Sequence, residues 1–151
     1  MNAALTQWLS EKGYAGDIDR PDAKGLTPVL KASSEGDVAI LRELIAAGAR
    51  LNARSLDGNN AIWLACAADS VDAITMLAAA GVDVNHQNPD GATALIYSSS
   101  AGKRPVVELL LKIGADATAQ TVDGFTALDL ASTEDCFWLL RGEKRRRETR
   151  V

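Results

Sequence analysis

A glycine recurs at one fixed interval along most of this 151-residue chain. It stands at Gly25, Gly58, Gly91 and Gly124, and threonine or asparagine follows two positions after each of them. A fixed period of this length indicates copies of one supersecondary unit, because each copy buries its apolar face only against its neighbours. The interval therefore predicts a repeat fold over most of the chain.

Each unit contains the signals of two helices. A second glycine series keeps the same interval and ends runs with apolar residues at helical spacing, such as AILRELIAAG before Gly48 and VVELLLKIG before Gly114. A first helix fits between the two glycines. Its cap oxygens come from residues at equivalent positions, namely Thr27, Asn60, Thr93 and Thr126. The predicted unit is turn, helix, loop, helix, and the predicted fold class is all-α.

The segments DGNNAIWLACAA and GKRPVVELLLKIGADAT show that the chain resembles the ankyrin repeat family, whose unit of about 33 residues has a β-turn and two helices. The resemblance implies an ankyrin-repeat solenoid of about four repeats over residues 1–140, with projecting turns, here called fingers, and first helices on a concave face. The expected elements are an N-terminal capping helix at 2–13 and repeats at 22–54, 55–87, 88–120 and 121–140, the last one truncated.

The two ends depart from the repeat pattern. We expect Trp8 and Trp138 to plug the core at opposite ends, and Phe137, Leu139 and Leu140 to help seal it at the C-terminal end. Residues 1–140 carry 10 basic and 18 acidic side chains, whereas residues 141–151 carry six basic and two acidic ones. So basic a segment has few apolar groups to bury, and we expect a disordered tail at 141–151.

The resemblance implies partner contacts at the finger tips and on the exposed side of the first helices. There, apolar residues lie next to aspartates, which predicts a protein partner with basic and apolar groups. Trp63 and Tyr97 fit inter-repeat packing as well as a contact role. The resemblance implies a histidine at the positions of Leu30, Trp63, Ile96 and Asp129, and its loss at all four predicts exposed apolar area on the concave side. The candidate contact residues are Arg54, Leu56, Asp57, Asn59, Trp63, Gln87, Pro89, Asp90, Ala92, Tyr97, Gln120, Val122, Asp123 and Phe125.

Nothing in the sequence predicts catalysis. His86, the sole histidine, has no cysteine or carboxylate at metal-ligand spacing, and the stretch SSSAGKR lacks the remaining residues of a phosphate loop. Cys66 and Cys136 indicate buried, reduced thiols. We therefore expect a non-enzymatic protein without metal, cofactor or small-molecule substrate.

The charge and the termini suggest the remaining expectations. A net charge of −4 argues against nucleic acid as the partner. Without a signal peptide or a membrane span, we expect a cytoplasmic monomer. An alternative function is recruitment through the tail, by basic contacts to an anionic surface or by PDZ-type recognition of Thr149, Arg150 and Val151.

Overall fold

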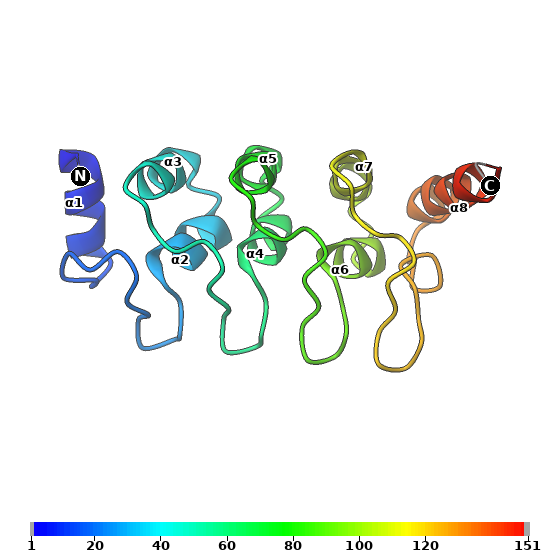
Figure 1. Ribbon diagram of the computed structural model, residues 1–151, viewed down its shortest axis with the longest axis horizontal. Helices are drawn as coiled ribbons and strands as arrows, with labels where there is room; N and C mark the ends of the chain where they lie inside the picture. Colours follow the sequence, from blue (N-terminus) through cyan, green and yellow to red (C-terminus); the bar gives the residue numbers. More distant parts are fainter. Residues whose placement is uncertain (1, 150–151) are drawn as a thin grey trace. The chain divides into compact units, whose positions relative to one another are not determined.

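The computed structural model describes residues 2–149, which form eight α-helices and no β-strand (Figure 1). The predicted all-α class is confirmed. The chain divides into two compact units, Met1–Asp83 and Val84–Val151. The boundary lies close to the predicted end of the second repeat at residue 87.

The first unit contains a capping helix and two helix pairs. Helix α1 spans Ala3–Glu11, inside the predicted range 2–13. The first pair is α2 (Pro28–Glu35) and α3 (Val38–Ala46), and the second is α4 (Ala61–Ala67) and α5 (Val71–Ala79). The first helices α2 and α4 pack on each other, while α3 packs between α1 and α5. The loops before α2 and α4 extend from the same side of this unit (Figure 1).

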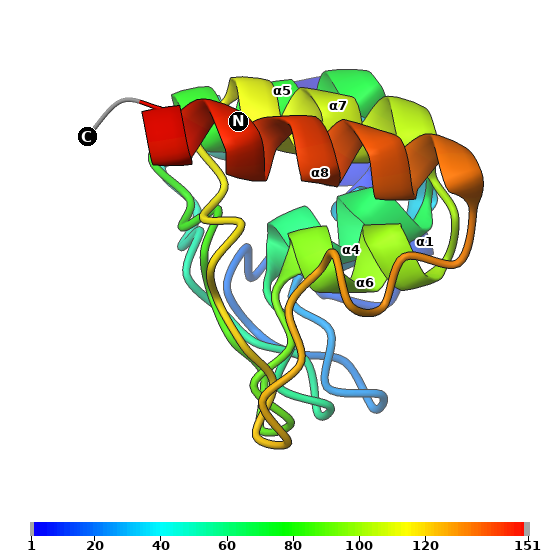
Figure 2. The same ribbon diagram turned by 90° about the vertical axis from the view of Figure 1, so that its right-hand side faces the viewer.

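The second unit contains α6 (Ala94–Ser100), α7 (Arg104–Lys112) and α8 (Glu134–Thr149). Helix α7 packs on both α6 and α8, and Figure 2 shows α7 and α8 lying side by side. The fingers of repeats three and four precede α6 and α8 in this unit.

The predicted caps form in the first three repeats. Side-chain oxygens of Thr27, Asn60 and Thr93 accept the backbone N–H three residues later, at 3.3, 3.1 and 3.1 Å. Asp37 and Ser70 do the same for α3 and α5, both at 3.2 Å. Each cap satisfies a backbone donor that the first helical turn leaves free. Short polar residues thus set where these helices begin.

The first helix predicted for repeat four does not form. Thr126 and Asp129 bond reciprocally, since the Thr126 N–H donates to Asp129 Oδ2 at 2.9 Å and the Asp129 N–H donates to Thr126 Oγ1 at 3.2 Å. The chain then makes only a turn. The Ser132 N–H donates across to the Ser99 carbonyl at 3.3 Å instead of continuing a helix. Repeat four therefore contributes a finger, a turn and one helix.

The prediction of a disordered tail is wrong for residues 141–149, which continue α8. Acidic Glu134 and Asp135 occupy the first turn of this helix and basic Arg146 and Arg147 the last, an arrangement that the helix dipole favours. Arg146 also pairs with Glu143 at 3.0 Å, three residues earlier. Residues 150 and 151 of the predicted tail lie outside the described residues.

The prediction for the C-terminal aromatic residues is also wrong. Trp138 is 62% exposed, and Phe137 is exposed beside it with the two rings edge to face at 5.1 Å between centroids. Cys136 and Leu140 are the buried residues of α8, because they lie on the opposite side of the helix. At the other terminus Trp8 is buried as predicted, and both cysteines are buried and free.

Tyr14 links the capping helix to the first finger. It is only 2% exposed, stacks on Trp8 with 5.9 Å between ring centroids, and donates its hydroxyl to the Leu26 carbonyl at 2.9 Å. Burial, reinforced by the nearby charge of Asp22, raises the pKa of the Tyr14 phenol far above its ordinary value. The folded chain therefore favours the protonated phenol.

This burial predicts a pH-dependent contribution to stability. Above about pH 10 the phenol of Tyr14 ionises in the unfolded chain but stays protonated in the folded chain. The contribution of Tyr14 to the free energy of unfolding therefore declines as the pH rises above about 10. We expect the difference in unfolding free energy between the wild type and Tyr14→Phe to shrink by about 1.4 kcal/mol per pH unit above about pH 10. Urea unfolding of both proteins at several pH values measures this difference, and a constant difference would contradict the prediction.

Candidate partner-binding surface

Two backbone hydrogen bonds close every finger in the same way. In each, the residue three before the repeat glycine donates its N–H to a carbonyl four residues later, at 2.9 to 3.0 Å. Its own carbonyl accepts the glycine N–H at 2.8 to 3.0 Å. The residues at this position are Asp22, Ser55, Asn88 and Thr121. The four fingers thus share one turn geometry.

The side chains at this position also bond the turn. Asp22 Oδ1 accepts the N–H groups of Lys24 and Leu26, and Asn88 Oδ1 accepts those of Asp90 and Ala92, all at 2.8 to 3.0 Å. The hydroxyls of Ser55 and Thr121 each accept one N–H at 3.2 Å. These four residues were not among the predicted functional or structural positions, although four short polar side chains at the period of the repeat are a visible signal in the sequence.

The three aspartates that directly precede the repeat glycines do not bond the turn with their side chains. Asp57, Asp90 and Asp123 are exposed, and within residues 2–149 their carboxylates make no hydrogen bond or ion pair. The turn is built by the residue two positions earlier. The charges of these three carboxylates are therefore available to a partner.

In the first unit, most of the predicted contact residues of the second finger lie at the surface. Arg54 and Asp57 are exposed, and Leu56 is 81% exposed although its side chain lies against Gly25 of the first finger. Asn59 is only 9% exposed, because its backbone N–H and carbonyl both bond Ser55. Asn59 therefore offers little side-chain surface to a partner.

Trp63 on α4 is half-buried, and its backbone N–H donates to the capping Oδ1 of Asn60. Leu30, at the equivalent position of α2, is fully buried, as is Ile96 of the second unit. The expectation that loss of histidine exposes apolar area is wrong at these two positions, because both side chains are buried.

In the second unit, the third and fourth fingers are bonded to each other. Gln87 Nε2 donates to the Gly91 carbonyl at 2.9 Å and to the Gln120 carbonyl at 3.0 Å. The Val122 N–H donates to the Asp90 carbonyl at 2.9 Å. Equivalent positions of these two repeats therefore lie side by side, as the fixed period of the sequence predicts. Gln87 is exposed, but its amide nitrogen already has a structural function.

The other predicted contact residues of the second unit differ in exposure. Pro89, Gln120 and Phe125 are exposed, and Val122 is 72% exposed. Ala92 and Tyr97 are half-buried. The Lys103 ammonium lies 5.8 Å from the centre of the Tyr97 ring, a cation–π distance. Val122 and Phe125 thus give the fourth finger two large exposed apolar side chains, and the other two described in this unit, Phe137 and Trp138, lie on α8.

The structure reveals no arrangement for metal chemistry. Within residues 2–149, no three or more histidine, cysteine, aspartate or glutamate side chains gather where they could hold a metal ion. No helix in the described part of the chain has the length and apolar character needed to cross a membrane. The exposed finger tips remain the candidate site.

Helix pairs joined by hydrogen-bonded turns define a helical repeat protein. A family model described as ankyrin repeats (3 copies) matches residues 2–88, and one described as ankyrin repeats (many copies) matches residues 77–131. The chain belongs to the ankyrin repeat family. A search of the curated proteins finds no match. Ankyrin repeats are generally protein–protein interaction modules.

The contact between fingers three and four predicts a contrast between two glycines. Both Gly91 and Gly124 have a positive φ, +76° and +86°. A Cβ on Gly91 would lie 2.8 Å from the backbone nitrogen of Val122, whereas one on Gly124 would meet nothing within 4 Å. We expect Gly124→Ala to cost about 1 kcal/mol for the backbone conformation alone. Gly91→Ala should cost at least about 1 kcal/mol more, because the backbone of the next finger must shift.

Chemical denaturation of the two variants and the wild type checks this contrast. Gly124 is the matched control, since it occupies the same position of the next repeat with a similar φ. Equal losses in both variants would show that the two fingers are not in contact.

Proposed function

We propose that this chain is a non-enzymatic binding module that holds another protein through its finger tips and the neighbouring part of its first helices. One observation carries the proposal. The same repeat position is apolar and exposed in three fingers, at Leu56, Pro89 and Val122, and a carboxylate without a partner follows each time. Folding does not require this pattern, because the turn bonds come from other residues.

The chemistry of these tips suggests the chemistry of the partner. Large apolar side chains at the surface gain free energy when another protein covers them, by about 25 cal/mol for each Å² removed from water. The adjacent aspartate carboxylates attract lysine or arginine side chains of a partner that lie around its apolar contact residues. They also guide the approach of such a basic partner. Phe125 adds an exposed ring to the fourth finger. A partner surface with apolar residues surrounded by lysine or arginine fits these features.

The experiment compares how much partner protein is captured by the intact chain, by a finger variant and by a control variant. Leu56→Ser combined with Val122→Ser removes apolar area at two finger tips, and we expect partner binding to weaken by about tenfold or more, since a few central residues carry most interface energy. Neither change affects the core, because both side chains are exposed.

The matched control combines Thr75→Ala and Glu108→Gln, which alter exposed positions on α5 and α7. The captured protein is identified by mass spectrometry, and its affinity for the purified chain is then measured by calorimetry. Retained binding by the finger variant together with lost binding by the control variant would place the interface on the second helices and overturn the proposal.

A second candidate function is recruitment through α8, and its surface favours this function. Arg141, Lys144 and Arg145 lie at the surface of the helix that also exposes Trp138. Basic side chains beside an aromatic ring suit an anionic surface. The PDZ-type alternative requires residues 150 and 151, which lie outside the described residues. Thr149 Oγ1 donates to carbonyls of α8, so strand addition would require the last turn to unwind.

Vesicle binding tests the α8 candidate. We expect the chain to sediment with vesicles that contain phosphatidylserine and not with vesicles of phosphatidylcholine alone, and added salt should release it because the attraction is electrostatic. Arg141→Gln combined with Arg145→Gln should reduce the bound fraction. The control, Arg42→Gln combined with Arg50→Gln, removes the same charge outside α8 and should leave the bound fraction unchanged. Equal binding to both types of vesicle would exclude this function.

A further inference from the structure

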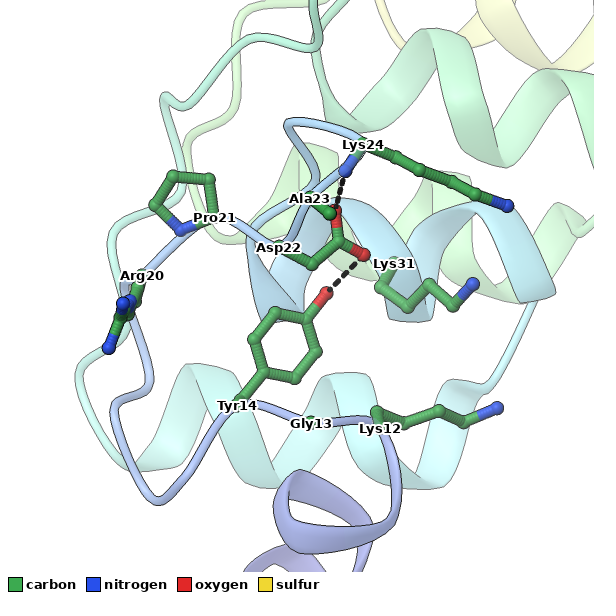
Figure 3. A pocket seen from close by; sticks show the side chains of 9 residues that line it. All are labelled: Lys12, Gly13, Tyr14, Arg20, Pro21, Asp22, Ala23, Lys24 and Lys31. Atoms are coloured by element: carbon green, nitrogen blue, oxygen red, sulfur yellow. Dashed lines mark hydrogen bonds between the residues drawn. The ribbon is translucent and has the colours of Figure 1, made fainter.

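Basic side chains gather around one hollow of the first unit, although that unit is acidic overall. Residues 1–83 contain seven lysines and arginines against eleven aspartates and glutamates. Four of the seven cations, Lys12, Arg20, Lys24 and Lys31, line an open hollow of about 480 Å³ beside Tyr14 and Asp22 (Figure 3). The hollow lies between the capping helix and the first finger. It is therefore a positive site on an otherwise negative unit.

The one carboxylate that lines the hollow is used by the fold. Asp22 accepts the N–H groups of Lys24 and Leu26 at 2.8 and 3.0 Å and the Tyr14 hydroxyl at 3.5 Å. Burial acts to raise the pKa of Asp22, but these hydrogen bonds and the nearby Lys31 outweigh it and hold the pKa below its ordinary value. Asp22 is thus an ionised group whose charge is offset in part by the N–H groups of its own turn.

The cations have few counter-charges. Lys12 and Lys31 share the single carboxylate of Glu35, at 3.0 and 4.0 Å. Arg20 and Lys24 are exposed and make no ion pair within residues 2–149. Four cations and one carboxylate, Asp22, therefore line the hollow, and within residues 2–149 Glu35 is the one carboxylate that forms ion pairs with any of the four.

The positions of the cations describe the ligand. In Figure 3 the lysine side chains extend toward one side of the Tyr14 ring and Arg20 lies on the other. Such a spread suits several separate anionic groups on one extended ligand better than one compact anion. Tyr14 is buried, so its ring offers no face on which a nucleotide base could stack. The concave surface also fits an inserted chain better than a flat lipid layer.

We propose that this hollow binds an acidic segment of a polypeptide, with Arg20 and Lys24 as its main anchors and Lys12 and Lys31 as further cations. The proposal does not depend on the finger surface, whose free aspartates favour a basic partner. Because the two main anchors, Arg20 and Lys24, are exposed, an arriving carboxylate loses little hydration in reaching them, and the attraction weakens as salt is added.

Fluorescence anisotropy with the full chain tests the proposal. The probe is a fluorescein-labelled peptide of alternating aspartate and glycine, and the same peptide with asparagine in place of aspartate is the control. We expect the aspartate peptide alone to bind. Arg20→Glu combined with Lys24→Glu should weaken its binding by about tenfold or more at physiological ionic strength.

The matched control is Arg42→Glu combined with Arg50→Glu, which makes the same charge change at exposed positions of the same unit, outside the hollow. We expect this variant to lose less than about threefold in affinity, because distant exposed charges are screened. Circular dichroism and thermal unfolding establish that both variants fold. If either variant does not fold, glutamine replaces glutamate in both pairs. The comparison is then Arg20→Gln with Lys24→Gln against Arg42→Gln with Arg50→Gln, and the expected loss of affinity is smaller.

Three results would overturn the proposal. These are no binding of the aspartate peptide at millimolar concentration, equal losses in the hollow and control variants, and equal binding of the asparagine peptide. Tighter binding of a thymidine oligonucleotide of the same charge would reassign the hollow to nucleic acid.

Discussion

Every finger depends on the bond between a short polar side chain and the backbone of its own turn. Asp22, Ser55, Asn88 and Thr121 differ in chemistry, yet each places an oxygen where the turn's N–H groups point. A buried N–H without a partner is costly, so this bond stabilises the turn from within its own repeat. The caps then start the first helices a few residues later, and the residues at the tips are left without a structural task.

Features set by local bonds could be predicted from the sequence, whereas features set by a neighbour or its absence could not. The caps at Thr27, Asn60 and Thr93 and the buried Trp8 follow from local pattern. Repeat four has Thr126 and Ala127 where repeat three has Thr93 and Ala94, yet it forms no first helix. There the Ser132 N–H bonds to the Ser99 carbonyl of repeat three. Composition also suggested disorder after Leu140, whereas the charges of α8 agree with its dipole. Trp138 is exposed because no described residue covers that side of α8.

The candidate site shows the same division. Exposure of Leu56, Asp57 and Val122 follows from their place in a finger, which the period of the repeat reveals. The burial of Asn59 and the bridging bonds of Gln87 could not be inferred, because both depend on the three-dimensional path of the turn. The basic hollow escaped notice because its four cations are scattered along the sequence, from Lys12 to Lys31. Only the fold of the capping segment against the first finger brings them together.

The bonds of Gln87 also bear on how such a surface can change. Its amide reaches the carbonyls of Gly91 and Gln120, which are groups that every amino acid carries. The Val122 N–H likewise meets the carbonyl of Asp90. Side chains at 90, 120 and 122 can therefore be exchanged without removing any of these links. Fingers three and four behave as a fixed support with interchangeable tips, so mutation can explore new binding specificities there while the spacing of the fingers stays the same.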